Sequence, residues 1–322
     1  MKSVITAQII AKNNAKTIRA TLESLIPMNS KILIGDLGCT DETIEICKSY
    51  DAEVIRISLN NDLSAARNHL AKQSDTEWNF FIEPWECVLA GHDSVLEHMG
   101  SKNNLSVSVL NGDVLTPSTR IWHGTNPMFI NPVFERIKGE SKHIEMYFSS
   151  GEEDKAMKFE LTQRWMERCP LSLDAVYYSA CCHLSNKNWD GFLNLADSYL
   201  HQAEIGMAST MIHYYYAMVN CYIKKNHQSA GQHIIFCLAK KPEMAEFWCL
   251  LADIYYAVKD YERARTFYEN GMFIGEKRLK NDGWPLEVSK YKEYPIKMIE
   301  ACKSIRQSSK YYGNIQAAPV SG

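Results

Sequence analysis

Acidic side chains follow short apolar runs at two places in the amino-terminal part of the chain, where carboxylates can bind nucleotides or cations. Asp36 follows the run KILIG, which is typical of a strand buried on both faces of a parallel sheet. Glu83 and Glu86 follow a second run, where Pro84 ends the strand. Open α/β sheets bind ligands outside the carboxyl ends of their strands. We therefore expect these carboxylates to lie near a ligand.

The segment after Asp36, GCTDET, passes through Gly38 into the start of a helix. Thr40 or Asp41 can cap this helix. A carboxylate at Asp41 would lie beside a helix amino terminus and close to a bound nucleotide. An aspartate at this position is also explained by helix capping alone. Helix capping and nucleotide binding therefore both stay open as roles of Asp41.

Strand-like runs alternate with helical patterns along the first third of the chain. Strands are expected at residues 4–11, 31–36, 53–57 and 78–82, and helices at residues 18–25, 43–50 and 64–72. This alternation predicts a right-handed parallel sheet with helices packed on it.

The order of four motifs resembles glycosyltransferase family 2, whose members have the GT-A fold. The motifs are AKNNAKTIRATLESL, GDLGCTDET, NDLSAARNHLAK and FFIEPWE, the last in the place of the D-x-D motif of the family. The resemblance covers residues 4–137. It implies that Asp36 hydrogen-bonds the base or ribose of a nucleotide sugar, usually a uridine nucleotide. Asp62, Arg67 and Asn68 would complete the nucleotide pocket.

The metal motif of the family is altered in this chain. Trp85 stands where the second aspartate would bind a divalent metal, with Glu83 at the first position and Glu86 one residue beyond the second. Mg²⁺ and Mn²⁺ require oxygen ligands, which indole lacks. An intact motif is therefore excluded. The two glutamates are left to hold a cation through the turn after Pro84, to bind ribose hydroxyls, or to flank a packed tryptophan as exposed acids.

Short strand patterns return after residue 104, separated by glycines, and predict an antiparallel extension of the sheet. In GT-A enzymes such an extension forms the acceptor side. Arg120 and His123 are expected either to meet diphosphate oxygens or to lie on the surface. Asp113, in a Gly-Asp turn, is a reserve candidate for a catalytic base.

The segment NPVFERI lies where TPR-bearing relatives in family 2 usually carry a His-Glu pair. Phe134 replaces the histidine, whereas Glu135 is retained. An inverting sugar transfer needs a general base for the proton of the acceptor, and the resemblance makes Glu135 the candidate. The alternative is a solvent-facing strand residue paired with Arg136 or Lys138.

Beyond residue 151 the periodicity is helical and contains a repeat of about 34 residues, in which Ala230 corresponds to Ala264. This spacing resembles the tetratricopeptide (TPR) repeat. A looser unit at residues 173–204 brings the number of units to three, enough for a solenoid. The tail from residue 304 lacks periodicity and is expected to be disordered.

The expected organisation follows from these patterns. A GT-A glycosyltransferase domain of the α/β class occupies residues 1–150, an all-α TPR-like domain occupies residues 151–303, and a disordered tail occupies residues 304–322.

Composition narrows the partners and the compartment. The 322 residues are 46% apolar and carry a net charge of -3, which gives no general attraction to nucleic acid or anionic membranes. A modified-base acceptor stays open. Ten cysteines without C-x-x-C pairs indicate buried reduced thiols and a cytoplasmic protein. No signal peptide and no apolar stretch long enough to span a membrane is visible.

The sequence favours a glycosyltransferase whose donor is held by Asp36, Asp41, Asp62, Arg67 and Asn68, with Glu83 and Glu86 near the ribose and diphosphate. Glu135 would activate an acceptor hydroxyl or thiol, and the TPR-like domain would hold the acceptor or a partner protein. A second hypothesis is a non-catalytic scaffold with the same fold. A nucleotidyltransferase is disfavoured, because AKNNAKT lacks the glycines of a phosphate-binding loop.

Overall fold

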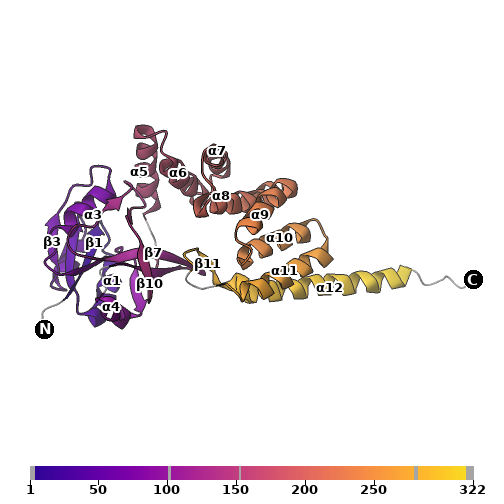
Figure 1. Cartoon of the computed structure of the whole chain (residues 1–322), viewed down its shortest axis with the longest axis horizontal. Coiled ribbons are helices and arrows are strands. Elements are labelled where there is room, and N and C mark those ends of the chain that lie inside the picture. Colours follow the sequence, from indigo (N-terminus) through magenta and orange to yellow (C-terminus); the bar gives the residue numbers. More distant parts are fainter. Residues whose placement is uncertain (1–3, 101–102, 152–153, 279–281, 317–322) are drawn as a thin grey trace, which may run out of the picture. The chain divides into compact units, whose positions relative to one another are not determined.

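The computed structural model describes residues 4–100, 103–151, 154–278 and 282–316. The chain forms two compact units, and Figure 1 labels many of their helices and strands. The first unit is Met1–Asn186 with Gly283–Pro285, and the second is Lys187–Asp282 with Leu286–Gly322.

Four parallel strands form one half of the sheet of the first unit, in the order β3-β2-β1-β4. Their bounds are β1 (Ile5–Ala11), β2 (Lys31–Asp36), β3 (Glu53–Arg56) and β4 (Trp78–Phe81). The helices between them are α1 (Ile18–Leu25), the 3-10 helix η1 (Ile26–Met28), α2 (Thr43–Lys48) and α3 (Leu63–Ala71). The predicted parallel sheet is confirmed, with its elements close to their expected positions.

Strand β1 is buried along its whole length, because helices cover both faces of the sheet. On one face α1 contributes Ile18, Leu22 and Leu25 to the main core. On the other face α3 packs Ala66 and Leu70 against β1 and β2. Burial on both faces explains why these strands are continuous apolar runs without alternation.

The other half of the sheet continues from β4 in the order β7-β6-β10-β5. The strands are β5 (Cys87–Ala90), β6 (Asn104–Asn111), β7 (Val114–His123) and β10 (Ser141–Ser149), and helix α4 (His92–His98) follows β5. The expected antiparallel extension is confirmed for β4-β7, β7-β6 and β10-β5. The pair β10-β6 is parallel instead. Between β7 and β10 the chain forms a separate ribbon of β8 (Phe129–Ile130) and β9 (Arg136–Ile137).

Two helices beyond the sheet belong to the first unit, α5 (Lys155–Arg168) and α6 (Leu173–Ser185). Helix α5 buries Leu161 against Leu63 of α3 and against Val133 in the β8–β9 loop. The compact unit is therefore longer than the domain expected at residues 1–150. Its additional helices are held by apolar contacts that a sequence pattern does not reveal.

The second unit is built from helices. They are α7 (Trp189–Leu200), α8 (Met207–Met218) with the π-helix η2 (Val219–Lys224), α9 (His227–Lys240), α10 (Ala245–Ala257), α11 (Tyr261–Gly275), the 3-10 helix η3 (Val288–Tyr291) and α12 (Glu293–Gln316), with the short strand β11 (Leu286–Glu287) before η3. Ala230 and Ala264 are fully buried, as the repeat requires. The predicted all-α region is confirmed. Within the described ranges, no helix has the length and apolarity needed to cross a membrane.

The carboxyl-terminal tail differs from the expectation of disorder. Helix α12 begins at Glu293 and continues to Gln316, so the part of the predicted tail at residues 304–316 is helical. Ile299 and Cys302 of this helix are buried against α10 and α11, which anchors its amino-terminal part. The remainder of the predicted tail, residues 317–322, lies outside the described residues.

A buried carboxylate joins several helices of the second unit. Asp253 of α10 accepts hydrogen bonds from the hydroxyl groups of Tyr222, Tyr268 and Tyr294. These tyrosines come from η2, α11 and α12. Hydrogen bonds to a charged group offset its desolvation, so Asp253 has a structural role.

A pair of histidines in the second unit predicts a dependence of stability on pH. Nδ1 of His213 lies 2.7 Å from Nδ1 of His233, and burial together with the second ring lowers the pKa of His213 from 6.5 to about 4. Between these two pH values the unfolded chain binds a proton that the folded chain does not. The free energy of unfolding should therefore fall as the pH falls from 6.5 toward 4. Urea unfolding of the parent and of His213→Gln should show a shallower fall in the variant; equal slopes would contradict this expectation.

Candidate functional site

Three strand ends meet at one edge of the sheet in the first unit. Because β1, β2 and β4 are parallel, the residues that follow them face the same edge. A cavity of about 30 Å³ lies there, which we call the edge cavity. Its lining includes Lys12, Leu37, Arg67, Glu83, Trp85, Glu135 and Lys158.

A larger cavity of about 250 Å³, which we call the polar cavity, adjoins the first. Its lining includes Glu83, Trp85, Glu86, Ser118, Arg120 and Lys158. Three residues therefore line both cavities: Glu83, Trp85 and Lys158. The altered metal motif lies at the junction of the two.

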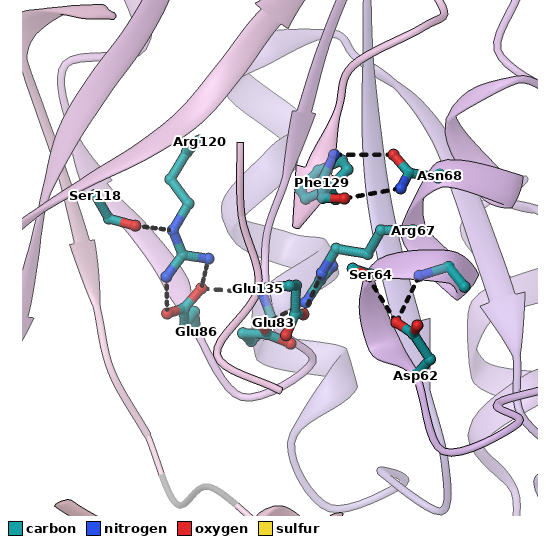
Figure 2. Close-up of polar contacts among 11 residues, drawn as sticks. Asp62, Ser64, Arg67, Asn68, Glu83, Glu86, Ser118, Arg120, Phe129 and Glu135 are labelled. Atoms are coloured by element: carbon teal, nitrogen blue, oxygen red, sulfur yellow. Dashed lines mark hydrogen bonds and ion pairs between the residues drawn. The ribbon is translucent and has the colours of Figure 1, made fainter. Parts of the chain in front are cut away.

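The central contact of the site is an arginine between two carboxylates (Figure 2). Nη2 of Arg67, from α3, lies 2.5 Å from Oε1 of Glu83, while its Nε donates to Oε1 of Glu135. The side chain of Arg67 is 3% exposed and that of Glu135 is 5% exposed. The guanidinium also lies 4.3 Å from the ring centroid of Phe81. These contacts compensate the charge of a buried guanidinium.

The two carboxylates that share Arg67 differ in acidity. Burial raises the pKa of Glu83, and the negative charges of Glu135 and Glu86 raise it further, outweighing Arg67. Burial also acts to raise the pKa of Glu135, but the charges of Arg67 and Lys158 outweigh it, and the pKa falls below its ordinary value. The lowered pKa of Glu135 keeps its carboxylate ionised at neutral pH.

A second buried ion pair lies beside the first. Arg120 donates from Nη1 and Nη2 to the two oxygens of Glu86, over 3.1 and 2.9 Å, and from Nε to Ser118. The backbone N–H of Glu83 donates to Glu86 as well. His123, the other candidate for the diphosphate, instead packs its ring against Trp78. Arg120 thus holds the turn after β4 in place.

The loop that carries Glu135 is fixed from two sides. Asn68, next to Arg67 on α3, donates to the carbonyl of Phe129 and accepts from its N–H. Phe134 has a positive φ of 54° and stacks on Tyr178 of α6 at 4.9 Å between ring centroids. A left-handed backbone at a bulky residue is strained, and the stacking holds it. Glu135 is consequently directed at Arg67.

Asp36 shapes the turn after β2. Its Oδ1 accepts from the N–H groups of Gly38 and Cys39, and its Oδ2 lies 2.8 Å from Nη1 of Arg56. Burial acts to raise the pKa of Asp36, but these donors outweigh it and lower the pKa. The carboxylate is therefore ionised at neutral pH.

The other two predicted aspartates bond to nearby backbone. Asp41 accepts from the N–H of Ala15 and from the N–H and hydroxyl of Thr43, which joins the turns after β1 and β2. Asp62 caps α3 by accepting from the N–H of Ala65. The cap position of α2 is Glu42, which makes no side-chain cap hydrogen bond, so Asp41 bonds to the first helical residue from one position before the cap. Asp62 is a cap in the full sense.

The structure brings together some of the predicted residues and leaves others apart. Arg67, Glu83 and Glu135 line the edge cavity, and Glu86 lines the polar cavity. Asp36, Asp41, Asp62 and Asn68 support the surrounding turns and do not line either one. The ligand contacts assigned to all of these residues stay predictions.

Sequence reasoning missed Lys158, which reaches the site from α5. The helix begins at the cap Asp154, whose side chain accepts from the N–H of Met157, and this places Lys158 in its second turn. The pattern predicted a helix here but assigned it to the TPR-like domain. Only the packing of α5 on the sheet reveals its role.

The donor set does not fit a magnesium or manganese ion. Both oxygens of Glu86 bond to Arg120, one oxygen of Glu83 bonds to Arg67, and Trp85 between them offers no oxygen ligand. The described part of the chain contains no group of three or more His, Cys, Asp or Glu side chains arranged for a metal. A cation bound by Glu83 and Glu86 would compete with Arg67 and Arg120 for these carboxylates.

The amino-terminal part of the chain matches a known family. Residues 6–88 match the model of glycosyl transferase family 2. The match covers 83 of the 322 residues. The resemblance inferred from the motifs is confirmed for this segment, which holds Arg67, Glu83 and Glu86. With the strand order above, the predicted fold class is confirmed, an α/β GT-A domain followed by helices.

Two curated glycosyltransferases are similar to part of this chain. The SPbeta prophage-derived glycosyltransferase SunS of Bacillus subtilis (strain 168) is 35% identical over 81 residues, which are 24% of this chain and 19% of the relative. Glycosyltransferase SunS of Bacillus phage SPbeta gives the same values. The match therefore spans only 19% of the length of these relatives.

Solved structures with a related arrangement include S. aureus TarS 1-349 in complex with UDP, at 12% identity and a TM-score of 0.36 over 94% of this chain and 91% of that chain. The Sgt2 TPR domain from Aspergillus fumigatus, at 15% identity and a TM-score of 0.35, covers 47% of this chain and 86% of that chain. The fold assignment rests on the strand order, the helices and the family 2 segment.

The buried pair of Arg120 and Glu86 gives a prediction about stability. Arg120→Met leaves the Glu86 carboxylate buried without its cation, which should lower the free energy of unfolding by about 3 kcal/mol. The double variant Arg120→Met with Glu86→Gln buries no charge and should recover most of this loss. Urea unfolding of the full chain would measure both. A double variant no more stable than the single one would contradict this account.

Proposed function

We propose that this protein is a glycosyltransferase that transfers a sugar from a UDP-linked donor to a hydroxyl or thiol of an acceptor, with inversion at the anomeric carbon. One observation carries the proposal. Glu135, a buried carboxylate outside the family 2 segment, lies in the same cavity as the residues that follow β1, β2 and β4 of that segment.

The reaction needs a base on the acceptor side. The acceptor oxygen or sulfur gives its proton to Glu135 while its electron pair forms the bond to the anomeric carbon. The bond from that carbon to the diphosphate oxygen breaks, and its electron pair leaves with UDP. Attack from the face opposite the leaving group inverts the configuration.

The acidity of Glu135 has two opposing effects on its role as a general base. Its lowered pKa keeps the carboxylate ionised, so it can accept a proton at neutral pH. A low pKa also makes a weak base, since general bases work best with a pKa near the operating pH. Any weakening of the contact with Arg67 in the acceptor complex would raise the basicity of Glu135.

The donor would lie along the strand ends. Asp36 would bond the base or ribose through lone pairs that Gly38, Cys39 and Arg56 leave available, with Asp41, Asp62, Arg67 and Asn68 shaping or completing the pocket. Glu83 and Glu86 would lie near the ribose and diphosphate.

The edge cavity is too small for a donor in this structure. Sites for molecules of nucleotide-sugar size enclose several hundred Å³, whereas the edge cavity has about 30 Å³. Asp154, Met157 and Lys158, from the start of α5, form one of its walls. A donor held in the edge cavity alone would therefore require one of its walls to move, and the start of α5 is one of them.

The helical unit would bind the acceptor or a partner protein. This assignment follows the expected division of labour, in which nucleotide-binding residues come from the amino-terminal part of the chain. A protein, a glycan and a modified nucleic acid are all compatible acceptors.

A thermal-shift panel tests the proposal against the scaffold alternative. UDP, GDP, CMP and dTDP would be added to the full chain with and without Mn²⁺. Ligand at about 100 times its dissociation constant stabilises a protein by about 2.7 kcal/mol, so UDP should give the largest shift. A chain that responds to none of the four nucleotides would favour the scaffold.

The variant Glu135→Gln tests the base. Glutamine keeps the size and the acceptor for Arg67 but cannot take the proton, so transfer should slow by roughly 10² to 10⁴ while the affinity for UDP stays unchanged. Glu140→Gln, at an exposed position in the next loop, is the matched control. Rates come from transfer to the native acceptor at saturating donor. A parental rate in Glu135→Gln would move the base elsewhere, with Asp113 next to be tested.

The variant Asp36→Asn tests the donor side. Asparagine still accepts from the turn N–H groups but lacks the charge, and hydrogen bonds to ionised groups are about twice as strong as neutral ones. The affinity for UDP should fall about tenfold, with the fold retained. Asp51→Asn, at an exposed residue with a φ of 55°, is the control. Calorimetric titration with equal affinities for Asp36→Asn and the parent would remove Asp36 from the donor site.

A further inference from the structure

The charges around the two cavities are unusual for a site that binds a diphosphate. Three carboxylates are present, from Glu83, Glu86 and Glu135. Arg67 bonds to two of them and Arg120 bonds to the third through both ends of its guanidinium. A donor diphosphate placed here would meet these acidic groups, so a cation beside it would offset their charge.

Lys158 is the basic residue whose position meets this need. Of the described residues that line the two cavities, it is the one basic side chain that lines both. Its Nζ lies 4.9 Å from the ring centroid of Phe134 and 6.0 Å from that of Trp85. Its charge also acts on both Glu83 and Glu135. The ammonium group therefore lies at the junction, beside the altered metal motif.

We propose that Lys158 binds the diphosphate of the donor and stabilises it as a leaving group, in place of a divalent cation at the altered motif. This inference rests on the proposed function. The geometry supports it because Trp85 removes a metal ligand at the same place where the ammonium group lies next to that ring.

The chemistry requires no transfer of a proton to the leaving group. When the bond to the anomeric carbon breaks, its electron pair adds negative charge to the diphosphate. An ammonium group carries three N–H donors, and its flexible stem lets it follow the moving oxygens. Because Lys158 belongs to α5, a shift of this helix that admits the donor would also adjust the position of the cation.

The experiment compares UDP with uridine, which lacks the phosphates. Calorimetric titration in EDTA would use the full-length parent and the variants Lys158→Met, Lys158→Arg and Lys155→Met. Lys155 is exposed on the first turn of the same helix and is the matched control. Lys158→Met should bind UDP about tenfold more weakly and uridine as well as the parent does. Lys158→Arg should keep most of the affinity, and Lys155→Met should behave as the parent.

Each other outcome has a separate meaning. If the parent binds UDP and Lys158→Met binds it equally well, Lys158 does not contact the diphosphate, while the proposed function stands. Equal losses for UDP and uridine would reduce Lys158 to a structural role. If UDP binding needs Mn²⁺, equally in the parent and in Lys158→Met, a metal ion and not Lys158 binds the diphosphate. A parent that binds neither UDP nor uridine overturns the proposed function and this inference with it.

Discussion

The contact of Arg67 with Glu83 and Glu135 is the constraint on which the rest of the site depends. A buried guanidinium is tolerated only where its charge is compensated, so α3, the end of β4 and the β8–β9 loop must stay in register. Asn68 fixes the same loop through the backbone of Phe129, one residue along α3. The site is therefore held by a helix of the parallel half and a loop of the antiparallel half, joined through two neighbouring side chains.

The parallel half could be predicted from the sequence because burial on both faces produces continuous apolar strands, as in β1 and β2. The partners of Arg67 could not, since Glu135 is 68 positions away and an ion pair over that distance leaves no local pattern. The contribution of α5 was hidden for a similar reason. Its sequence predicts a helix, but only tertiary packing of Leu161 decides which unit it joins.

Aspartates posed a different difficulty. A carboxylate at a strand end or helix start serves equally to bond backbone N–H groups or to meet a ligand, and the residue types are the same in both cases. In the folded chain, the carboxylate of Asp41 accepts from the backbone N–H of Ala15, and that of Asp62 accepts from the N–H of Ala65. They act on the site through the loops they shape, whereas the glutamates reach the cavities with their own side chains.

The long-range ion pairs also bear on the order in which the chain folds. The family 2 segment ends at residue 88, yet the partners that compensate Glu86 and Arg67 include Arg120 and Glu135, which are synthesised later. Closing such loops costs entropy before any contact repays it. During synthesis, Arg67 of α3 and Glu86 of the turn after β4 would lack part of their partners until β7 and the β8–β9 loop are in place. Residues beyond the matched segment therefore complete the charge compensation within it.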